Sequence, residues 1–207
     1  MQDFFQQIAS QFAQTTWLEW LGTLTGFLCV YLAARQHIWN WPISIISVSS
    51  YAILFYGTRL YGDAVLQFYF LCTAVYGWYY WLKRKEEKKK PIVKASKLEL
   101  LLSMLAVLLL TGILGYFLDS QTNSDVPYID AFCTAMSFVA QFLMTRKVLQ
   151  NWLLWVFVDI CYIPLYIHKE LMLTAVLYFV FTIIAWNGYR DWRKTYQNFA
   201  YYCSSKR

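Results

Sequence analysis

The second half of the chain repeats a large part of the first half. When the sequence is shifted so that Trp17 lies on Tyr128, residues 17–83 lie on residues 128–194 without a gap and agree at 18 of 67 positions. The identical pairs include Arg35 and Arg146, Asn40 and Asn151, Trp41 and Trp152, Gly77 and Gly188, and Trp81 and Trp192. Apolar segments that agree by chance would not keep Arg, Asn, Trp and Gly in register. We therefore predict two copies of one structural unit.

The composition indicates that both copies lie in a membrane. Hydrophobic residues make up 59% of the chain and charged residues 14%, whereas soluble domains have roughly 45–50% and about 25%. The apolar residues also form runs close to the ~20 residues that cross a bilayer as a helix. The runs are Trp17–Ala34, Trp39–Tyr56, Leu60–Leu82, Leu98–Leu118, Tyr128–Thr145, Leu149–Ile167 and Leu171–Trp192. We predict an all-α integral membrane protein with seven transmembrane helices.

The distribution of basic residues predicts the orientation in the membrane. The segment from Lys83 to Lys97 contains eight Lys and Arg residues, counting both ends, and such residues accumulate on the cytoplasmic side. Successive loops lie on alternating sides of the membrane, so this assignment places 16 of the 18 basic residues on the cytoplasmic side and leaves Arg59 and Lys169 on the outer side. The N-terminus is then outside and the C-terminus inside. We interpret the basic loop as a topology signal in contact with anionic lipid rather than as a nucleic-acid site.

The fourth span allows two units with an odd number of helices to have the same orientation in the membrane. A three-helix unit ends on the side opposite to its start, so a directly joined copy would be inverted, and one extra crossing restores the direction. The result is a 3+1+3 arrangement of parallel repeats around an axis along the membrane normal. The predicted parts are an interfacial helix at 1–16, the first repeat at 17–83, a basic loop, linker helix and acidic outer loop at 84–127, the second repeat at 128–194, and a cytoplasmic tail at 195–207.

Several function classes have little support in the sequence. Neither GxxxxGK[ST] nor GxGxxG occurs, which argues against a pump with its own nucleotide site. The cysteines lie within spans or in the tail, and His37 and His168 lie on opposite membrane sides, so we expect no disulfide, metal or cofactor. A membrane enzyme or receptor-like scaffold would need a catalytic cluster or a large soluble loop. A channel is a further alternative, but bulky rings would obstruct it, so a solute carrier is favoured.

Polar residues within the spans predict where a solute binds, because each is costly in hydrocarbon and tends to face the bundle interior. Asn151, Trp155 and Asp159 recur at four-residue intervals, so they share one helix face. The repeat places Asn40 at the position of Asn151. The third and seventh spans add Asp63, Gln67, Tyr178 and Asn187. We predict that these faces meet in one cavity with Asp159 as its carboxylate.

This set of side chains suits a flat, positively charged solute that carries hydroxyl groups. Aromatic faces attract cations, and amide side chains both donate to and accept from hydroxyls. Structural alternatives remain open. Trp17, Trp20, Trp39 and Trp41 fit an interfacial aromatic belt. Asp63 also fits a solvated helix cap, and Trp152 and Trp155 lie on different faces, so at most one is expected to face the cavity fully.

Four segments resemble the PnuC family of bacterial vitamin-precursor transporters. They are residues 144–155, 185–188, 60–67 and 76–81, and the resemblance extends from Trp17 to Trp192. It implies a homotrimer in the bacterial inner membrane, related in fold to SWEET sugar transporters. The implied function is facilitated diffusion of nicotinamide riboside, with phosphorylation in the cytoplasm trapping the product. It further implies that Gln67, the motif Asn151–Trp155 with Trp152, and Asn187 surround the substrate. Members for thiamine and riboflavin are the alternatives within the family.

Overall fold

The computed structural model describes residues 16–57, 61–86, 92–122, 126–168 and 172–204. These residues form seven helices: α2 (Trp17–Ala34), α3 (Asn40–Gly57), α4 (Tyr61–Glu86), α5 (Lys97–Gln121), α6 (Pro127–Thr145), α7 (Asn151–His168) and α8 (Met172–Ser204). The predicted interfacial helix at 1–16 lies almost entirely outside the described residues. The prediction of an all-α fold is confirmed.

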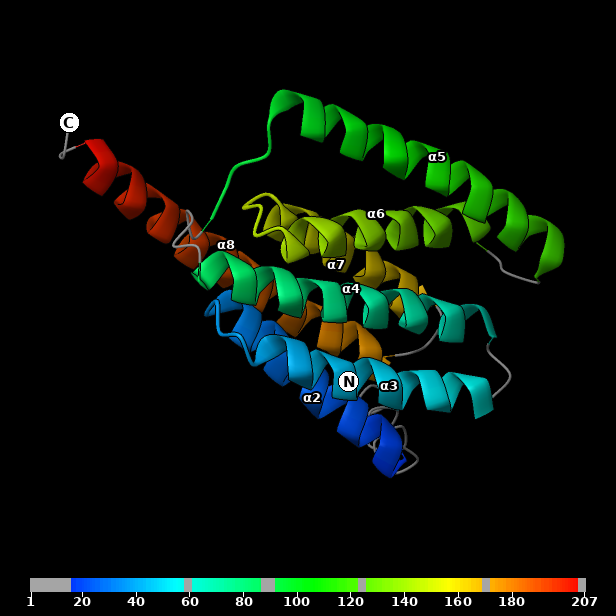
Figure 1. Cartoon of the computed structure of the whole chain (residues 1–207). Coiled ribbons are helices and arrows are strands. Elements are labelled where there is room, and N and C mark those ends of the chain that lie inside the picture. The colour runs from blue at the N-terminus through cyan, green and yellow to red at the C-terminus, as the bar shows by residue number, and fades with distance from the viewer. Residues whose placement is uncertain (1–15, 58–60, 87–91, 123–125, 169–171, 205–207) are drawn as a thin grey trace, which may run out of the picture.

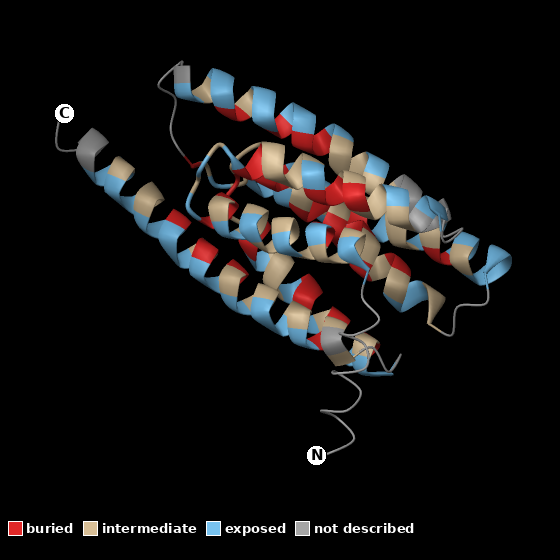
Figure 2. Ribbon diagram, turned by 90° about the horizontal axis from the view of Figure 1, so that it is seen from below, coloured by how far each residue is buried: buried red, intermediate tan, exposed pale blue. Residues whose placement is uncertain are grey.

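The helices lie side by side in one bundle (Figure 1). Helices α2, α3 and α4 pack in sequence, as do α6, α7 and α8, and the two groups meet where α2 contacts α8 and where α4 contacts α6. Helix α5 packs along α6, on the side of the bundle away from α2 and α3. Buried residues gather where helices face one another, whereas the outward faces are largely exposed (Figure 2).

Four helices, α2, α5, α6 and α7, are long and apolar enough to cross a membrane by length and composition. Helix α3 is less apolar because it contains Asn40 and four serines. Helix α4 ends in a charged turn, Lys83–Glu86, and α8 passes from an apolar first part into Arg190, Asp191, Arg193 and Lys194. Helix α8 continues to Ser204, well past the predicted end at Trp192, because no Gly or Pro follows Gly188 to stop it.

Helix starts in this chain are set by local side-chain chemistry. Thr16 and Glu19 form a capping box at α2, and Ser96 and Glu99 form another at α5. In the second box, the Ser96 N–H donates to Glu99 Oε2 at 2.8 Å, and the Glu99 N–H donates to Ser96 Oγ at 3.1 Å. Helix α6 instead begins with Pro127, whose missing N–H is not needed in the first turn.

The segment that precedes α5 is pinned to the turn between α6 and α7. The Val93 N–H donates to the Lys147 carbonyl at 3.1 Å, and the Leu149 N–H donates to the Val93 carbonyl at 2.8 Å. Ile92 is 1% exposed and belongs to the core. The residues after the basic loop therefore pack into the bundle, although the sequence predicted only a loop there.

Local geometry recurs at aligned positions of the two repeats. Gln36 and Lys147 both adopt a positive φ, 55° and 56°, in the turns after α2 and α6. At the following helix starts, Asn40 Nδ2 donates to the His37 carbonyl at 2.8 Å, and Asn151 Nδ2 donates to the Val148 carbonyl at 2.6 Å. The shared Asn thus has a structural role, because its amide closes the turn that enters α3 or α7.

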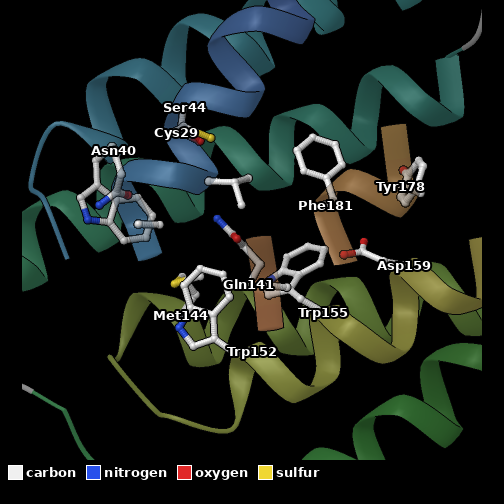
Figure 3. Close-up of a pocket in the computed structure, with 14 residues that line it drawn as sticks. Cys29, Asn40, Ser44, Gln141, Met144, Trp152, Trp155, Asp159, Tyr178 and Phe181 are labelled. Atoms are coloured by element: carbon white, nitrogen blue, oxygen red, sulfur yellow. The ribbon is translucent and has the colours of Figure 1, made fainter. Parts of the chain in front are cut away.

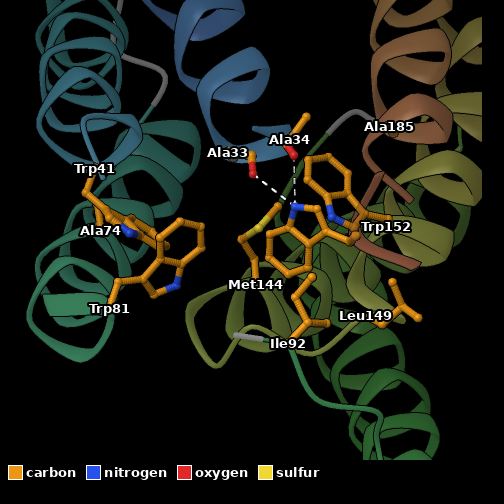
Figure 4. Packing of buried hydrophobic residues seen from close by; sticks show 11 residues of the cluster. Ala33, Ala34, Trp41, Ala74, Trp81, Ile92, Met144, Leu149, Trp152 and Ala185 are labelled. Atoms are coloured by element: carbon orange, nitrogen blue, oxygen red, sulfur yellow. Dashed lines mark hydrogen bonds between the residues drawn. The ribbon is translucent and has the colours of Figure 1, made fainter. Parts of the chain in front are cut away.

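Four tryptophans form a layer that joins the two groups of helices (Figure 4). Trp41 packs edge-on against Trp81 with 5.2 Å between ring centroids, and Trp152 packs edge-on against Trp192 with 5.6 Å between ring centroids. The ring centroids of Trp81 and Trp192 are 6.0 Å apart. The hydrogen bonds cross between the groups. Trp81 Nε1 on α4 donates to the Thr145 carbonyl on α6 at 3.1 Å.

The second crossing bond is the counterpart of the first. Trp192 Nε1 on α8 donates to the carbonyls of Ala33 and Ala34 on α2, at 3.2 and 3.1 Å. Trp41 is 1% exposed, so the alternative that placed it in a lipid-facing belt is wrong. Trp17 and Trp39, at 75% and 59% exposed, remain compatible with a belt.

Candidate functional site

A cavity of about 180 Å³ lies next to the tryptophan layer, between helices from both groups. It is lined by Cys29, Val30 and Ala33 of α2, Asn40, Trp41 and Ser44 of α3, Gln141 and Met144 of α6, Trp152, Trp155 and Asp159 of α7, and Tyr178, Phe181 and Ala185 of α8 (Figure 3). We call it the central cavity. Helix α4 contributes none of these lining residues.

One end of the central cavity combines aromatic rings with a carboxylate. Trp155 and Asp159 are one turn apart on α7, and Tyr178 and Phe181 approach from α8 (Figure 3). Asp159 is 3% exposed, and its carboxylate makes no ion pair with any residue that the structure describes. A buried carboxylate without a cationic partner suits a positively charged ligand, because burial of a lone charge is costly.

The opposite end offers groups that can form hydrogen bonds. Asn40 and Ser44 lie on α3, and the Gln141 side chain lies between them and the aromatic end (Figure 3). The indole Nε1 atoms of Trp41 and Trp152 are buried and have no hydrogen-bond partner among the described residues. Buried donors are normally satisfied, so these two N–H groups, on residues that line the cavity, lack the partner that such groups usually have.

The cavity is bounded by residue pairs that the repeat aligns with each other. Four such pairs line it: Val30 and Gln141, Ala33 and Met144, Trp41 and Trp152, and Ser44 and Trp155. The members of three pairs differ in chemistry. The second member is larger or more polar, so the two sides of the cavity present different surfaces and can hold an asymmetric ligand in one orientation.

Five of the nine residues predicted to bind substrate line the central cavity, namely Asn40, Trp152, Trp155, Asp159 and Tyr178. Both Trp152 and Trp155 reach it, although the sequence predicted that at most one would face it fully. They can do so because the cavity extends along α7 by more than one helix turn, from Trp152 to Asp159.

The other four predicted residues have different positions. Asn151 is fully buried and caps the entry of α7 through its amide. Gln67 is partly buried on α4 and is not among the lining residues of the cavity. Asn187 is exposed and lines a separate groove between α2 and α8. Asp63 lies in the first turn of α4, and its side chain is outside the described part of the structure.

Gln141 is the polar lining residue that sequence reasoning missed. The available signal was its position in the apolar run of α6, one turn before the helix end at Thr145, where an amide in hydrocarbon is costly. Ser44 shares a face of the second span with Asn40 at a four-residue interval, so the sequence does place it beside a predicted site residue.

Three tyrosines close the bundle beyond the carboxylate end of the cavity. Tyr162 and Tyr166 on α7 stack with 5.5 Å between their ring centroids. The ring centroid of Tyr178 on α8 lies 4.8 Å from that of Tyr162 and 5.1 Å from that of Tyr166. Tyr178 is both a member of this stack and part of the cavity lining. The cavity therefore lies between a tyrosine layer on one side and the tryptophan layer on the other.

Comparison with known proteins identifies relatives over most of the chain. Residues 16–194 match the family described as nicotinamide mononucleotide transporter. The chain is 29% identical over 203 residues to the nicotinamide riboside transporter PnuC of Escherichia coli (strain K12), covering 86% of this chain and 85% of that protein. It is 25% identical to the riboflavin/roseoflavin transporter RibM of Streptomyces davaonensis, covering 85% and 84%.

A solved structure has the same overall fold. It is a crystal structure of the vitamin B3 transporter PnuC, which superimposes with a TM-score of 0.71 at 26% sequence identity. The similarity covers 94% of this chain and 90% of that one.

Proposed function

The chain belongs to the nicotinamide mononucleotide transporter family, and we propose that it imports nicotinamide riboside across the bacterial inner membrane by facilitated diffusion. The observation that carries this proposal is the central cavity, whose lining combines a buried carboxylate that forms no ion pair with any described residue, aromatic rings and the polar side chains of Asn40, Ser44 and Gln141. Relatives named as nicotinamide riboside transporters support the choice of substrate.

The aromatic end of the cavity suits the pyridinium ring of this substrate. The ring is flat and carries a positive charge, which Asp159 balances. Trp155 and Phe181 provide faces that stack on an aromatic cation, an interaction worth about 2 kcal/mol or more away from water. Of the other predicted residues, Gln67, Asn151 and Asn187 are not among those that line the cavity, so we assign the substrate contacts to the residues that border it.

The hydrogen-bonding end suits the ribose and its hydroxyls. Gln141 can donate and accept at once, and the two indole N–H groups of Trp41 and Trp152 can donate to oxygen. This division of the cavity gives the substrate one orientation, with the ring near Asp159 and the sugar near the tryptophan layer.

We also propose that the helices form a 3+1+3 arrangement of parallel repeats, with α5 as the linker, the N-terminus outside and the C-terminus inside. The recurrence of turns, caps and tryptophan contacts at aligned positions supports the repeat. The concentration of Lys and Arg at the ends of α2, α4, α6 and α8 supports the orientation. A homotrimer, and phosphorylation in the cytoplasm as the trap, remain proposals carried by the family resemblance.

Riboflavin is the second candidate substrate, because the relative RibM is named as its transporter. The three fused rings of riboflavin need a longer apolar slot than the ring of nicotinamide, and a cavity of about 180 Å³ favours the smaller molecule. Thiamine, which is cationic and aromatic like nicotinamide riboside, is the closest competitor in charge.

The test is uptake into liposomes that contain the purified protein. Labelled nicotinamide riboside should enter, and unlabelled riboside should compete better than thiamine or riboflavin. Replacing Trp155 with Ala should weaken riboside binding by roughly 1–3 kcal/mol, and replacing it with Phe should recover part of the loss. Faster uptake of thiamine or riboflavin than of the riboside would overturn the assignment.

A further inference from the structure

A second cavity lies outside the bundle interior, between the C-terminal end of α2 and the middle of α8. It has a volume of about 350 Å³ and shares no lining residue with the central cavity. Its polar lining comes from Arg35 of α2 and from Asn187, Arg190, Asp191 and Lys194 of α8. We call it the α2/α8 groove.

The groove carries an excess of positive charge. Three cationic side chains, Arg35, Arg190 and Lys194, face one carboxylate, Asp191, so the formal charge is 3 − 1 = +2. None of the four forms an ion pair with another residue in the described part of the chain. The Arg35 guanidinium lies over the Tyr31 ring at 5.7 Å, which holds it at the groove. Arginine forks of this kind match phosphate oxygens.

The C-terminal end of α2 would ordinarily repel an anion, because a helix C-terminus has exposed carbonyl groups and a partial negative charge. Here those carbonyls are occupied. Trp192 Nε1 donates to the carbonyls of Ala33 and Ala34. The His37 N–H, in addition, donates to the Leu32 carbonyl at 2.8 Å. The groove therefore presents cationic side chains rather than free carbonyl oxygens.

Two apolar stripes lead into the groove. On α2, exposed residues at helical spacing are Leu21, Leu24, Leu28 and Tyr31, followed by Arg35. On α8, the exposed series is Val176, Val180 and Ile183, followed by Asn187, Arg190 and Lys194. The two helices run in the same direction (Figure 1). Both stripes thus change from apolar to cationic at the same end of the bundle.

The other repeat lacks this combination. Arg35 and Lys194 have identical counterparts in Arg146 and Lys83, but the positions that the repeat aligns with Asn187, Arg190 and Asp191 are Tyr76, Tyr79 and Tyr80. Helix α6, which corresponds to α2, is packed along α5. Two of the three groove cations thus recur in the other half, whereas Arg190 and the polar residues Asn187 and Asp191 are specific to α8.

We propose that the α2/α8 groove binds the phosphate group of an anionic phospholipid, whose acyl chains lie along the two apolar stripes. Basic pockets between transmembrane helices at the cytoplasmic side are suited to such headgroups, and the order of tails and phosphate along a lipid matches the order of apolar and cationic residues. A contact with a second copy of the chain fits less well, because interface cores are depleted in charged residues. The assignment to the cytoplasmic leaflet rests on the proposed orientation.

The experiment measures lipid binding to the purified full-length protein by native mass spectrometry, with phosphatidylglycerol and phosphatidylcholine as probes. The protein should retain phosphatidylglycerol in preference to phosphatidylcholine. Because each basic residue contributes roughly a fivefold gain toward anionic lipid, the double variant R190Q/K194Q should bind phosphatidylglycerol roughly 30-fold more weakly. The matched control K83Q/R193Q removes two exposed charges outside the groove and should keep the wild-type affinity.

Four results would overturn the proposal. The first is that the wild-type protein binds both lipids equally, and the second is that both double variants lose phosphatidylglycerol binding to the same extent. The third is that inorganic phosphate binds as strongly as phosphatidylglycerol. The fourth is that R190Q/K194Q dissociates from an oligomer while its lipid binding is unchanged. Riboside binding is measured on the same variants. It should not change, because Arg190 and Lys194 lie outside the central cavity, so failure of the lipid site and failure of the transport assignment give different results.

Discussion

At the scale of single residues, two glycines decide how closely the tryptophans approach their neighbouring helices. A Cβ at Gly77 would collide with the Trp41 ring, and a Cβ at Gly188 would lie 2.9 Å from the Trp152 ring. Both rings are 1% exposed and packed edge-on against another indole. Neither ring can move aside without disturbing the tryptophan layer.

We therefore expect Gly77→Ala to destabilise the protein. Overpacking of a filled core costs about 1–3 kcal/mol, which outweighs the gain of up to ~1 kcal/mol from replacing a helical glycine. Thermal unfolding in detergent measures the effect. Gly112→Ala is the control, because nothing lies within 4 Å of that Cβ position, and it should leave the melting temperature unchanged or raise it. Equal behaviour of the two variants would contradict the packing argument.

The amide of Gln141 allows a test of how the substrate is oriented. We expect Gln141→Leu to weaken binding of nicotinamide riboside by about 1–3 kcal/mol, because a hydroxyl in the cavity would lose its partner. Binding of free nicotinamide, which lacks the ribose, should weaken much less. Calorimetry on purified protein gives both affinities. Gln67→Leu is the control, since Gln67 lies on α4 outside the cavity lining, and an equal loss in that variant would contradict the assignment.

The residues of the site were partly predictable from sequence. Asp159 and Trp155 follow from a helical interval within an apolar span, because a carboxylate in hydrocarbon has few structural explanations. Asn151 satisfied the same criterion but serves as a cap, and a cap within a span cannot be distinguished from a ligand by spacing alone. The role of Asn187 was equally ambiguous. The sequence shows which residues share a face of α8, but it does not determine how far the helix is rotated, and therefore not whether that face points into the bundle or away from it.

At the scale of helices, the crossing hydrogen bonds of the tryptophan layer connect the two halves of the protein. Trp192→Phe keeps most of the ring but removes the N–H that donates to the carbonyls of Ala33 and Ala34. Loss of a partner for a buried carbonyl costs about 1–3 kcal/mol. We expect a corresponding fall in thermal stability, measured in detergent.

Trp186→Phe provides the matched control for this variant, because Trp186 is on the same helix and 49% exposed. It should have little effect on unfolding. Trp81→Phe removes the bond to the Thr145 carbonyl and should resemble Trp192→Phe. A larger loss in Trp186→Phe than in Trp192→Phe would show that the crossing bonds are unimportant.

Helix bounds could be predicted better than the segments between them. Six predicted starts fall within one residue of the observed ones, because apolar runs and caps are local features. The segment at Ile92 and Val93 could not be predicted in the same way. Its place depends on backbone bonds to Lys147 and Leu149, which are distant in the sequence and are brought near by the packing of α6 and α7.

At the scale of the whole molecule, the repeat and its departures have separate consequences. The shared Asn, Trp and Gly residues build equivalent turns and packing in both halves. Differences at aligned positions, such as Val30 and Gln141 or Ser44 and Trp155, make the cavity asymmetric. The residues that the two sequence repeats share thus build the packing, whereas the positions at which the repeats differ make the two sides of the cavity unlike.

The charged and titratable groups around the central cavity predict how transport is driven. Asp159 is the carboxylate in the lining of the central cavity, and within the described residues no group of three His, Cys, Asp or Glu could hold a metal ion. Proton relays in transporters are built from chains of Asp, Glu and His side chains, whereas the layers on either side of the cavity consist of tyrosines and tryptophans. We therefore expect riboside to equilibrate across liposome membranes without response to an imposed proton or sodium gradient. Enclosing a riboside kinase with ATP should convert equilibration into accumulation. Concentration of riboside above the external level in liposomes without kinase, driven by either gradient, would show that an ion is coupled.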